Sequence, residues 1–162
     1  MHSEEKKNLY SEIYRQMVSL LEETRFALPS LSNCSALVYS QLPDLNWCGF
    51  YILHQNELIL GPFQGNPACI RIAPGKGVCG TALQKQTTIR VENVHLFPGH
   101  IACDARSNSE IVIPLFDADH QIRGVFDLDS PQLNRFDTID QEGLEELCSL
   151  LQSSLSWEPK IL

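Results

Sequence analysis

Most residues of this sequence that could do acid–base or redox chemistry lie in one stretch, from Cys69 to Asp129. The stretch opens with ACIRIAPGKGVCG, runs through VENVHLFPGHIACDARSNSEIVIP and closes with GVFDLDSP. Thiols, imidazoles and carboxylates recur in it, among them Cys69, Cys79, His95, His100, Cys103, Glu110, Asp127 and Asp129. Polar and glycine-rich surroundings are costly for a segment that serves only as core, so we interpret the stretch as a redox active site.

The six cysteines divide into two groups by their surroundings: Cys69, Cys79 and Cys103 lie in this stretch, and the other three lie outside it. Cys79 lies in or near the first turn of a predicted helix, GVCGTALQKQ, where backbone N–H groups should lower its pKa and make it an attractive nucleophile. Cys103 lies near the end of a long polar loop, HLFPGHIACDARSNS, of a length that often marks a functional segment. Cys34, Cys48 and Cys148 fall on apolar faces and are predicted to be core residues.

Strand periodicity adds carboxylates and aromatic rings to the candidates. In IRGVFDLD, alternation places Asp127 and Asp129 on one face, about 7 Å apart. The strand that begins at Trp47 presents Trp47 and Tyr51 on one face and Cys48 on the other. The carboxylates either face the site or form a solvated strand edge, and Trp47 is either a ligand wall or a core aromatic.

Composition limits the class of protein. A chain of 162 residues with 43% hydrophobic residues fits one domain with a substantial core. Its net charge of −8, with no basic cluster, argues against nucleic acid and anionic membrane as partners. No apolar run approaches a membrane span, and MHSEEKKNLY is too polar for a secretory signal, so we expect a cytoplasmic protein with few structural disulfides.

The elements that must position these residues follow from the apolar pattern. A helix capped by Ser3 is interrupted by Pro29, and a second helix ends before Pro43. A hairpin, a short strand, a helix, another strand and two paired strands follow, with Pro114 indicating an edge or a bulge. A last helix begins at the N-cap Asp137. Strands joined by hairpins, with helices at the termini, predict an α+β domain with a mainly antiparallel sheet.

This order of elements is similar to a GAF domain. Three segments, RIxxGxGVCG, HxFPGHIACDxxSxSEIVxP and GVxDxDSPxxxRFD, closely resemble free methionine-(R)-sulfoxide reductases, which are enzymes of the GAF fold. The resemblance extends from about Trp47 to Asp140. It implies a single GAF-like domain over residues 1–162, with N- and C-terminal helices packed against the sheet.

The resemblance also implies a role for each candidate. Cys103 corresponds to the nucleophile that becomes a sulfenic acid, Cys69 to the thiol that resolves it, and Cys79 to the family's third cysteine. This conflicts with the interpretation of Cys79 as the activated thiol, and we follow the more specific family motif. Asn93 stands where the family more often has an acid. The implied substrate pocket contains Trp47, Glu110, Asp127 and Asp129, with Tyr51 on the same strand face as Trp47.

The implied reaction accounts for these residue types. A thiolate that attacks a sulfoxide sulfur needs the oxygen protonated, and a crowded acidic site keeps a carboxylic acid partly protonated for this purpose. The same carboxylates would bind the α-ammonium group of free methionine (R)-sulfoxide, which a residue inside a polypeptide lacks. The sulfenic acid then condenses with a thiol, and thioredoxin restores both thiols without a cofactor.

Two alternatives use the same residues differently. A GAF-type sensor would bind a small ligand without turnover, but it would not need three thiols. A zinc site formed by Cys69, Cys79, Cys103 and His100 would lack a C-x-x-C pair, so no metal is expected. His95 and His100 are explained as well by ordering their loop as by catalysis. A homodimer through the terminal helices resembles what related domains form.

Overall fold

The structure is a computed structural model that describes residues 1–100 and 105–157 of the chain. A short 3-10 helix, Val94–Leu96, precedes β5. The main elements are α1 (Ser3–Glu23), α2 (Ala27–Gln41), β1 (Trp47–His54), β2 (Glu57–Gly65), β3 (Arg71–Ile72), α3 (Gly77–Lys85), β4 (Ile89–Val91), β5 (Ser109–Phe116), β6 (Ile122–Ser130) and α4 (Thr138–Ser154).

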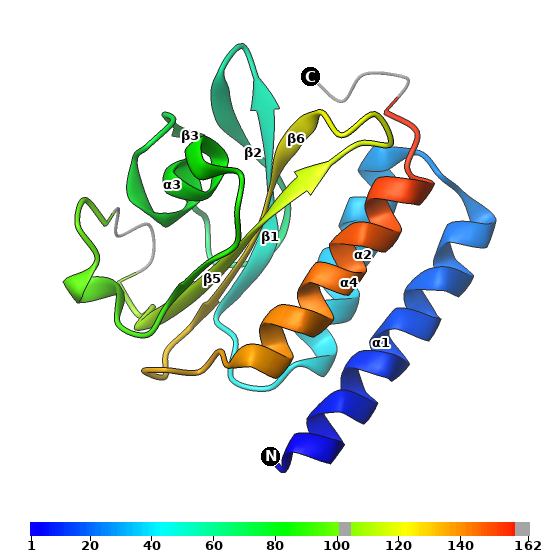
Figure 1. Cartoon of the computed structure of the whole chain (residues 1–162), viewed down its shortest axis with the longest axis horizontal. Coiled ribbons are helices and arrows are strands. Elements are labelled where there is room, and N and C mark those ends of the chain that lie inside the picture. Colours follow the sequence, from blue (N-terminus) through cyan, green and yellow to red (C-terminus); the bar gives the residue numbers. More distant parts are fainter. Residues whose placement is uncertain (101–104, 158–162) are drawn as a thin grey trace.

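The strands form one six-stranded sheet in the order β3-β2-β1-β6-β5-β4, in which all neighbours are antiparallel. Helices α1, α2 and α4 lie on one side of the sheet and α3 lies on the other (Figure 1). The predicted α+β domain with a mainly antiparallel sheet and helices at both termini is confirmed: α2 and α4 pack on the sheet, and α1 packs on α2 and α4. None of the helices in the described ranges is long and apolar enough to cross a membrane.

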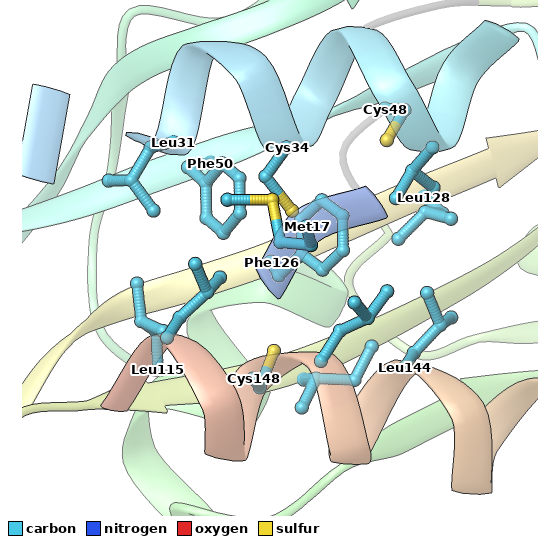
Figure 2. Close-up of a cluster of buried hydrophobic side chains, with 14 of the residues drawn as sticks. Met17, Leu31, Cys34, Cys48, Phe50, Leu115, Phe126, Leu128, Leu144 and Cys148 are labelled. Atoms are coloured by element: carbon cyan, nitrogen blue, oxygen red, sulfur yellow. The ribbon is translucent and has the colours of Figure 1, made fainter. Parts of the chain in front are cut away.

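The main hydrophobic core lies between the sheet and these three helices (Figure 2). Alternation along β1 sends Cys48 and Phe50 into this core, where the Phe50 ring stacks on Phe126 with centroids 4.3 Å apart. Cys34 and Cys148 complete a trio of fully enclosed thiols with Cys48, as predicted. Burial raises the pKa of all three, that of Cys34 to about 12, so they behave as small hydrophobes.

Two predicted helix boundaries were wrong. The N-cap of α1 is His2 rather than Ser3. The His2 backbone N–H donates to the Glu5 carboxylate as part of a capping box. Pro29 does not end α1, which stops at Glu23, but lies in the first turn of α2. A proline is tolerated there because its missing N–H would have no acceptor within the helix. The predicted N-cap of α4, Asp137, is confirmed.

Pro114 is accommodated as its chemistry requires. Strand β4 pairs with β5 only from Glu110 to Val112, so Pro114 lies beyond the part of β5 that β4 covers. A register shift follows between Leu115 and Phe116 on the β6 side. The residue therefore stands both at a local edge and beside a bulge, which are the places where a missing ladder donor costs least.

A buried ionic network joins α1 to the start of α4. Asp140 has a fully buried side chain that accepts hydrogen bonds from Lys6, from the Tyr10 hydroxyl at 2.8 Å and from Arg135 at 3.1 Å. Lys6 also contacts Asp137 at 2.9 Å. The Lys6 and Arg135 side chains are only 9% and 8% exposed, so the buried Asp140 carboxylate compensates both cations, and Lys6 has the more exposed Asp137 as a second partner.

We predict that Asp140→Asn lowers the free energy of unfolding by about 3–5 kcal/mol, because it removes the carboxylate that pairs with the buried Arg135 and leaves Lys6 with only the largely exposed Asp137. Urea unfolding at pH 7 measures the change. The control is Glu12→Gln, which removes an exposed i,i+3 partner of Arg15 and should leave the midpoint close to that of the wild type. Equal midpoints for the two variants would contradict the importance of the network.

Candidate active site

Cross-strand register builds the floor of the candidate site. Asp129 of β6 lies directly opposite Trp47 of β1 on one side and Glu110 of β5 on the other. Two residues along β6, Asp127 lies opposite Gly49. Because side chains alternate along each strand, all of these positions face α3 rather than the helical core. The prediction that Asp127 and Asp129 share a face is confirmed, and Glu110 joins them from the next strand.

A pocket opens between this floor and the N-terminal end of α3. Trp47 and Tyr51 stack with ring centroids 5.8 Å apart and form an apolar wall of the pocket. Of the two roles considered for Trp47, a ligand wall or a core aromatic, the geometry therefore fits the ligand wall. Phe63 backs this wall by stacking on Trp47 at 5.3 Å. The full lining is Trp47, Tyr51, Pro67, Ala68, Ile72, Lys76, Gly77, Val78, Cys79, His100, Ser107, Glu110, Asp127 and Asp129.

The chemical groups at the base of the pocket lie close together. The Cys79 thiol, the Glu110 carboxyl and the Asp127 carboxyl place atoms within 4.8 Å of one another, and the Cys79 Sγ donates to Glu110 Oε1 at 3.9 Å. All three residues are buried, and the Oδ1 atom of Asp127 has no hydrogen-bond partner among the described residues. A buried acceptor without a partner is costly, so this atom marks a place where a ligand donor would be stabilised.

Burial and mutual repulsion keep protons in this cluster. The pKa of Glu110 lies well above its usual value because of burial and the charges of Asp127 and Asp129. Burial also raises the pKa of Asp127 from 3.8 to about 7, although hydrogen bonds with Cys79 and Glu110 lower it in part. Near neutral pH the pocket therefore contains at least one carboxylic acid able to give up a proton.

The structure contradicts the expected activation of Cys79. The residue does lie in the first turn of α3, as predicted, but it is only 4% exposed. Burial, followed by the charges of Asp127 and Glu110, raises its pKa well above the usual value. The N–H groups at the helix terminus do not offset these two effects, so Cys79 is a neutral hydrogen-bond donor rather than a thiolate.

The other two predicted thiols differ in what can be said of them. Cys69 is half-buried in the segment before β3 and is disulfide-bonded. The Tyr51 hydroxyl donates to the Cys69 carbonyl at 2.9 Å, which ties this segment to β1. Cys103 lies outside the described residues. Its assignment as the nucleophile therefore stays a prediction.

Three polar pocket residues were not among the predicted site residues: Lys76, His100 and Ser107. His100 Nε2 lies 4.0 Å from Glu110 Oε2, and burial together with the nearby His95 lowers the pKa of His100. The FPGH motif, which ends at His100, is the sequence signal that could have predicted His100 in the pocket. His95 hydrogen-bonds Asn108 at 2.8 Å, which fits the loop-ordering role considered for it.

The zinc ligands considered from the sequence include Cys103, which lies outside the described residues. In the part of the chain that the structure describes, the only trio of possible ligand atoms is that of Cys79, Glu110 and Asp127. Each would have to lose its proton, and the raised pKa values of all three oppose this near neutral pH.

The fold and the pocket define a GAF domain, and residues 30–156 match the family model described as GAF domain. A free methionine-R-sulfoxide reductase of Escherichia coli is 48% identical over 93% of this chain and 91% of its own length. The reduced fRMsr of Staphylococcus aureus is 51% identical, with a TM-score of 0.87 and coverage of 91% and 95% of the two chains.

A third relative is the free methionine-R-sulfoxide reductase of Neisseria meningitidis, whose structure contains its substrate. It is 41% identical, with a TM-score of 0.87 and coverage of 91% of this chain and 88% of the other. The chain therefore belongs to the free methionine-R-sulfoxide reductases of the GAF domain family.

The raised pKa of Asp127 predicts a pH-dependent stability. Between about pH 4 and pH 7 the folded state keeps a proton on Asp127 that the unfolded state has lost, so stability falls as pH rises. Relative to Asp127→Asn, the wild type should lose up to about 1.4 kcal/mol per pH unit in this window. Urea unfolding at several pH values measures the loss. Asp119→Asn, at an exposed turn, is the control and should follow the wild type.

Proposed function

We propose that this protein reduces free L-methionine (R)-sulfoxide to L-methionine, as an oxidoreductase. The observation that carries the proposal is the buried cluster of Glu110, Asp127 and Cys79 beside an aromatic wall. In a chain 48% identical to a relative with this named activity, the cluster has the groups that the reaction needs. It combines a proton donor with acceptors for a cationic substrate group.

Substrate recognition is assigned to two sides of the pocket. The ring faces of Trp47 and Tyr51 contact the methyl and methylene groups of the sulfoxide. The unpaired Oδ1 of Asp127 and the half-buried Asp129 accept hydrogen bonds from the α-ammonium group. A methionine sulfoxide within a polypeptide has an amide in place of this ammonium group and would leave the buried carboxylate uncompensated.

Proton transfer is assigned to Glu110. Its raised pKa keeps it protonated near neutral pH, which suits donation to the sulfoxide oxygen as the S–O bond weakens. Cys79, which donates to Glu110 at 3.9 Å, holds this carboxyl in place and assists without attacking. The pKa of His100 is lowered, so its ring is neutral at the pocket wall and does not supply a competing positive charge.

The redox steps are assigned to Cys103 and Cys69. The Cys103 sulfur bonds to the sulfoxide sulfur as the sulfoxide oxygen is protonated. The resulting hydroxyl then moves to Cys103 as the substrate S–O bond and the transient S–S bond break, which releases methionine and leaves Cys103 as a sulfenic acid. The Cys69 thiol then displaces that oxygen as water and forms a disulfide with Cys103. A dithiol reductant of the thioredoxin type reduces this disulfide and regenerates both thiols. The disulfide-bonded state of Cys69 supports its resolving role.

The setting of the enzyme belongs to the same proposal. We place the activity in the cytoplasm, where thioredoxin-type reductants keep thiols reduced. The whole chain, residues 1–162, acts as one domain that uses no cofactor. Two copies associate through their terminal helices. Sedimentation of the reduced protein tests the association.

The substrate assignment predicts selectivity for the free amino acid. Acetylating the α-amino group of methionine (R)-sulfoxide should lower kcat/KM by about 10–150-fold, the loss expected for a hydrogen bond to a charged group. Methionine formation from the resolved R and S sulfoxides, free and acetylated, measures this. Equal rates on the free and acetylated R sulfoxides would contradict the role of the carboxylates. Binding without methionine formation would indicate a GAF-type sensor instead.

The three thiols should differ in a single turnover without reductant. Cys103→Ser should form no methionine, because a hydroxyl is a far poorer nucleophile than a thiolate. Cys69→Ser should release about one equivalent and then stall with thioredoxin, because no disulfide forms. Cys79→Ser should keep substantial activity, because this thiol only assists; complete loss of the first turnover would favour Cys79 as the nucleophile. Rapid quench with methionine and free-thiol counts measures all three. A stoichiometric burst from Cys103→Ser contradicts the assignment.

A further inference from the structure

The segment that carries Cys69 depends on side chains from the middle of the sheet. Residues 66–70 run between β2 and β3 without regular structure. The Trp47 indole N–H donates to the Asn66 carbonyl at 3.1 Å, and the Tyr51 hydroxyl donates to the Cys69 carbonyl at 2.9 Å. The two rings that wall the substrate pocket thus also hold two points of this segment.

These hydrogen bonds determine what the polar ends of the two rings can do. An indole N–H is a single donor, and a tyrosine hydroxyl has one proton to donate. Both donors point at backbone carbonyls of the segment, so the rings meet a ligand in the pocket through their faces. Burial, followed by the charge of Asp127, raises the pKa of Tyr51, which keeps its hydroxyl a donor at all working pH values.

The peptide of Cys69 is the most directly held part of the segment. Its carbonyl accepts from Tyr51, and the carbonyl of the next residue, Ile70, accepts from the Leu60 N–H of β2 at 3.0 Å. Ile70 has a side chain that is 69% exposed, so side-chain packing at that residue adds little to the anchoring. The Tyr51 hydroxyl therefore ties the Cys69 peptide directly to the central strand β1, and the next peptide is tied to β2.

From this contact we propose that Tyr51 is a positioning residue for the resolving step, in which the Cys69 thiol condenses with the sulfenic acid. The proposal rests on the proposed function. In that step the Cys69 sulfur forms a bond to the sulfenic sulfur, the S–O bond breaks, and oxygen leaves as water with the thiol proton. The hydroxyl of Tyr51 takes no part in the bond changes. It holds the Cys69 backbone in one orientation, which lowers the entropic cost of bringing the thiol to the sulfenic acid.

The test separates the two steps in Tyr51→Phe, which keeps the ring face and removes only the hydroxyl. Fully reduced protein is mixed with one equivalent of methionine (R)-sulfoxide without reductant and quenched at intervals. Methionine, disulfide and sulfenic acid trapped by a 1,3-diketone are counted. The ratio of the rate of disulfide formation to that of methionine release should fall about tenfold, and trapped sulfenic acid should accumulate.

The matched control is Tyr10→Phe, which removes another buried tyrosine hydroxyl, one that donates to Asp140 far along the sequence from the pocket segments. It should lower stability but leave the ratio of the two rates unchanged. An unchanged ratio in Tyr51→Phe overturns the positioning role, as does an equal fall in both variants. Absence of any methionine from the wild type would instead overturn the proposed function, so the two failures are distinguishable.

Discussion

The cost of burying negative charge beneath α3 governs this structure. Glu110 of β5 lies diagonally across from Asp127 of β6, and the Cys79 thiol of α3 lies close to both carboxyl groups. Water is excluded, so burial raises the pKa of all three groups, and the charge of Asp127 raises the pKa of Glu110 and of Cys79 further. Such a pocket retains protons and favours the binding of a cationic ligand. The proposed reaction needs both properties, the first for the sulfoxide oxygen and the second for the α-ammonium group.

One face of the sheet carries the main hydrophobic core, and the other carries the candidate active site. On the helical face, apolar side chains and inert thiols fill a continuous core, and the Lys6–Asp140 network anchors α1 to α4. On the other face, the carboxylates and rings project from strands that pair on both sides. The face that holds the pocket is thus supported by a face whose groups take no part in the proposed chemistry.

The error over Cys79 shows why magnitudes matter in such a site. The N-terminus of a helix favours a nearby anion by about 0.3–1 kcal/mol, which is less than one pKa unit. Burial and like charges can move a pKa by several units. The sequence reveals the helix position of Cys79 but not that Glu110 and Asp127 lie against it. The small effect of the helix terminus on the pKa could therefore be predicted, whereas the larger effect of burial and neighbouring charges could not.

Local periodicity in the sequence was enough to predict the α+β fold, the shared face of Asp127 and Asp129, and the core positions of Cys34, Cys48 and Cys148. These properties depend on the geometry of a single helix or strand, which repeats with a known period. The family motif added the identity of the pocket residues. Only the tertiary structure decided that Glu110 lies opposite Asp129, that α3 seals Cys79 from water and that Tyr51 holds the Cys69 carbonyl. Strand register, burial and hydrogen bonds between distant segments depend on which surfaces meet and exclude water, and no local pattern specifies that.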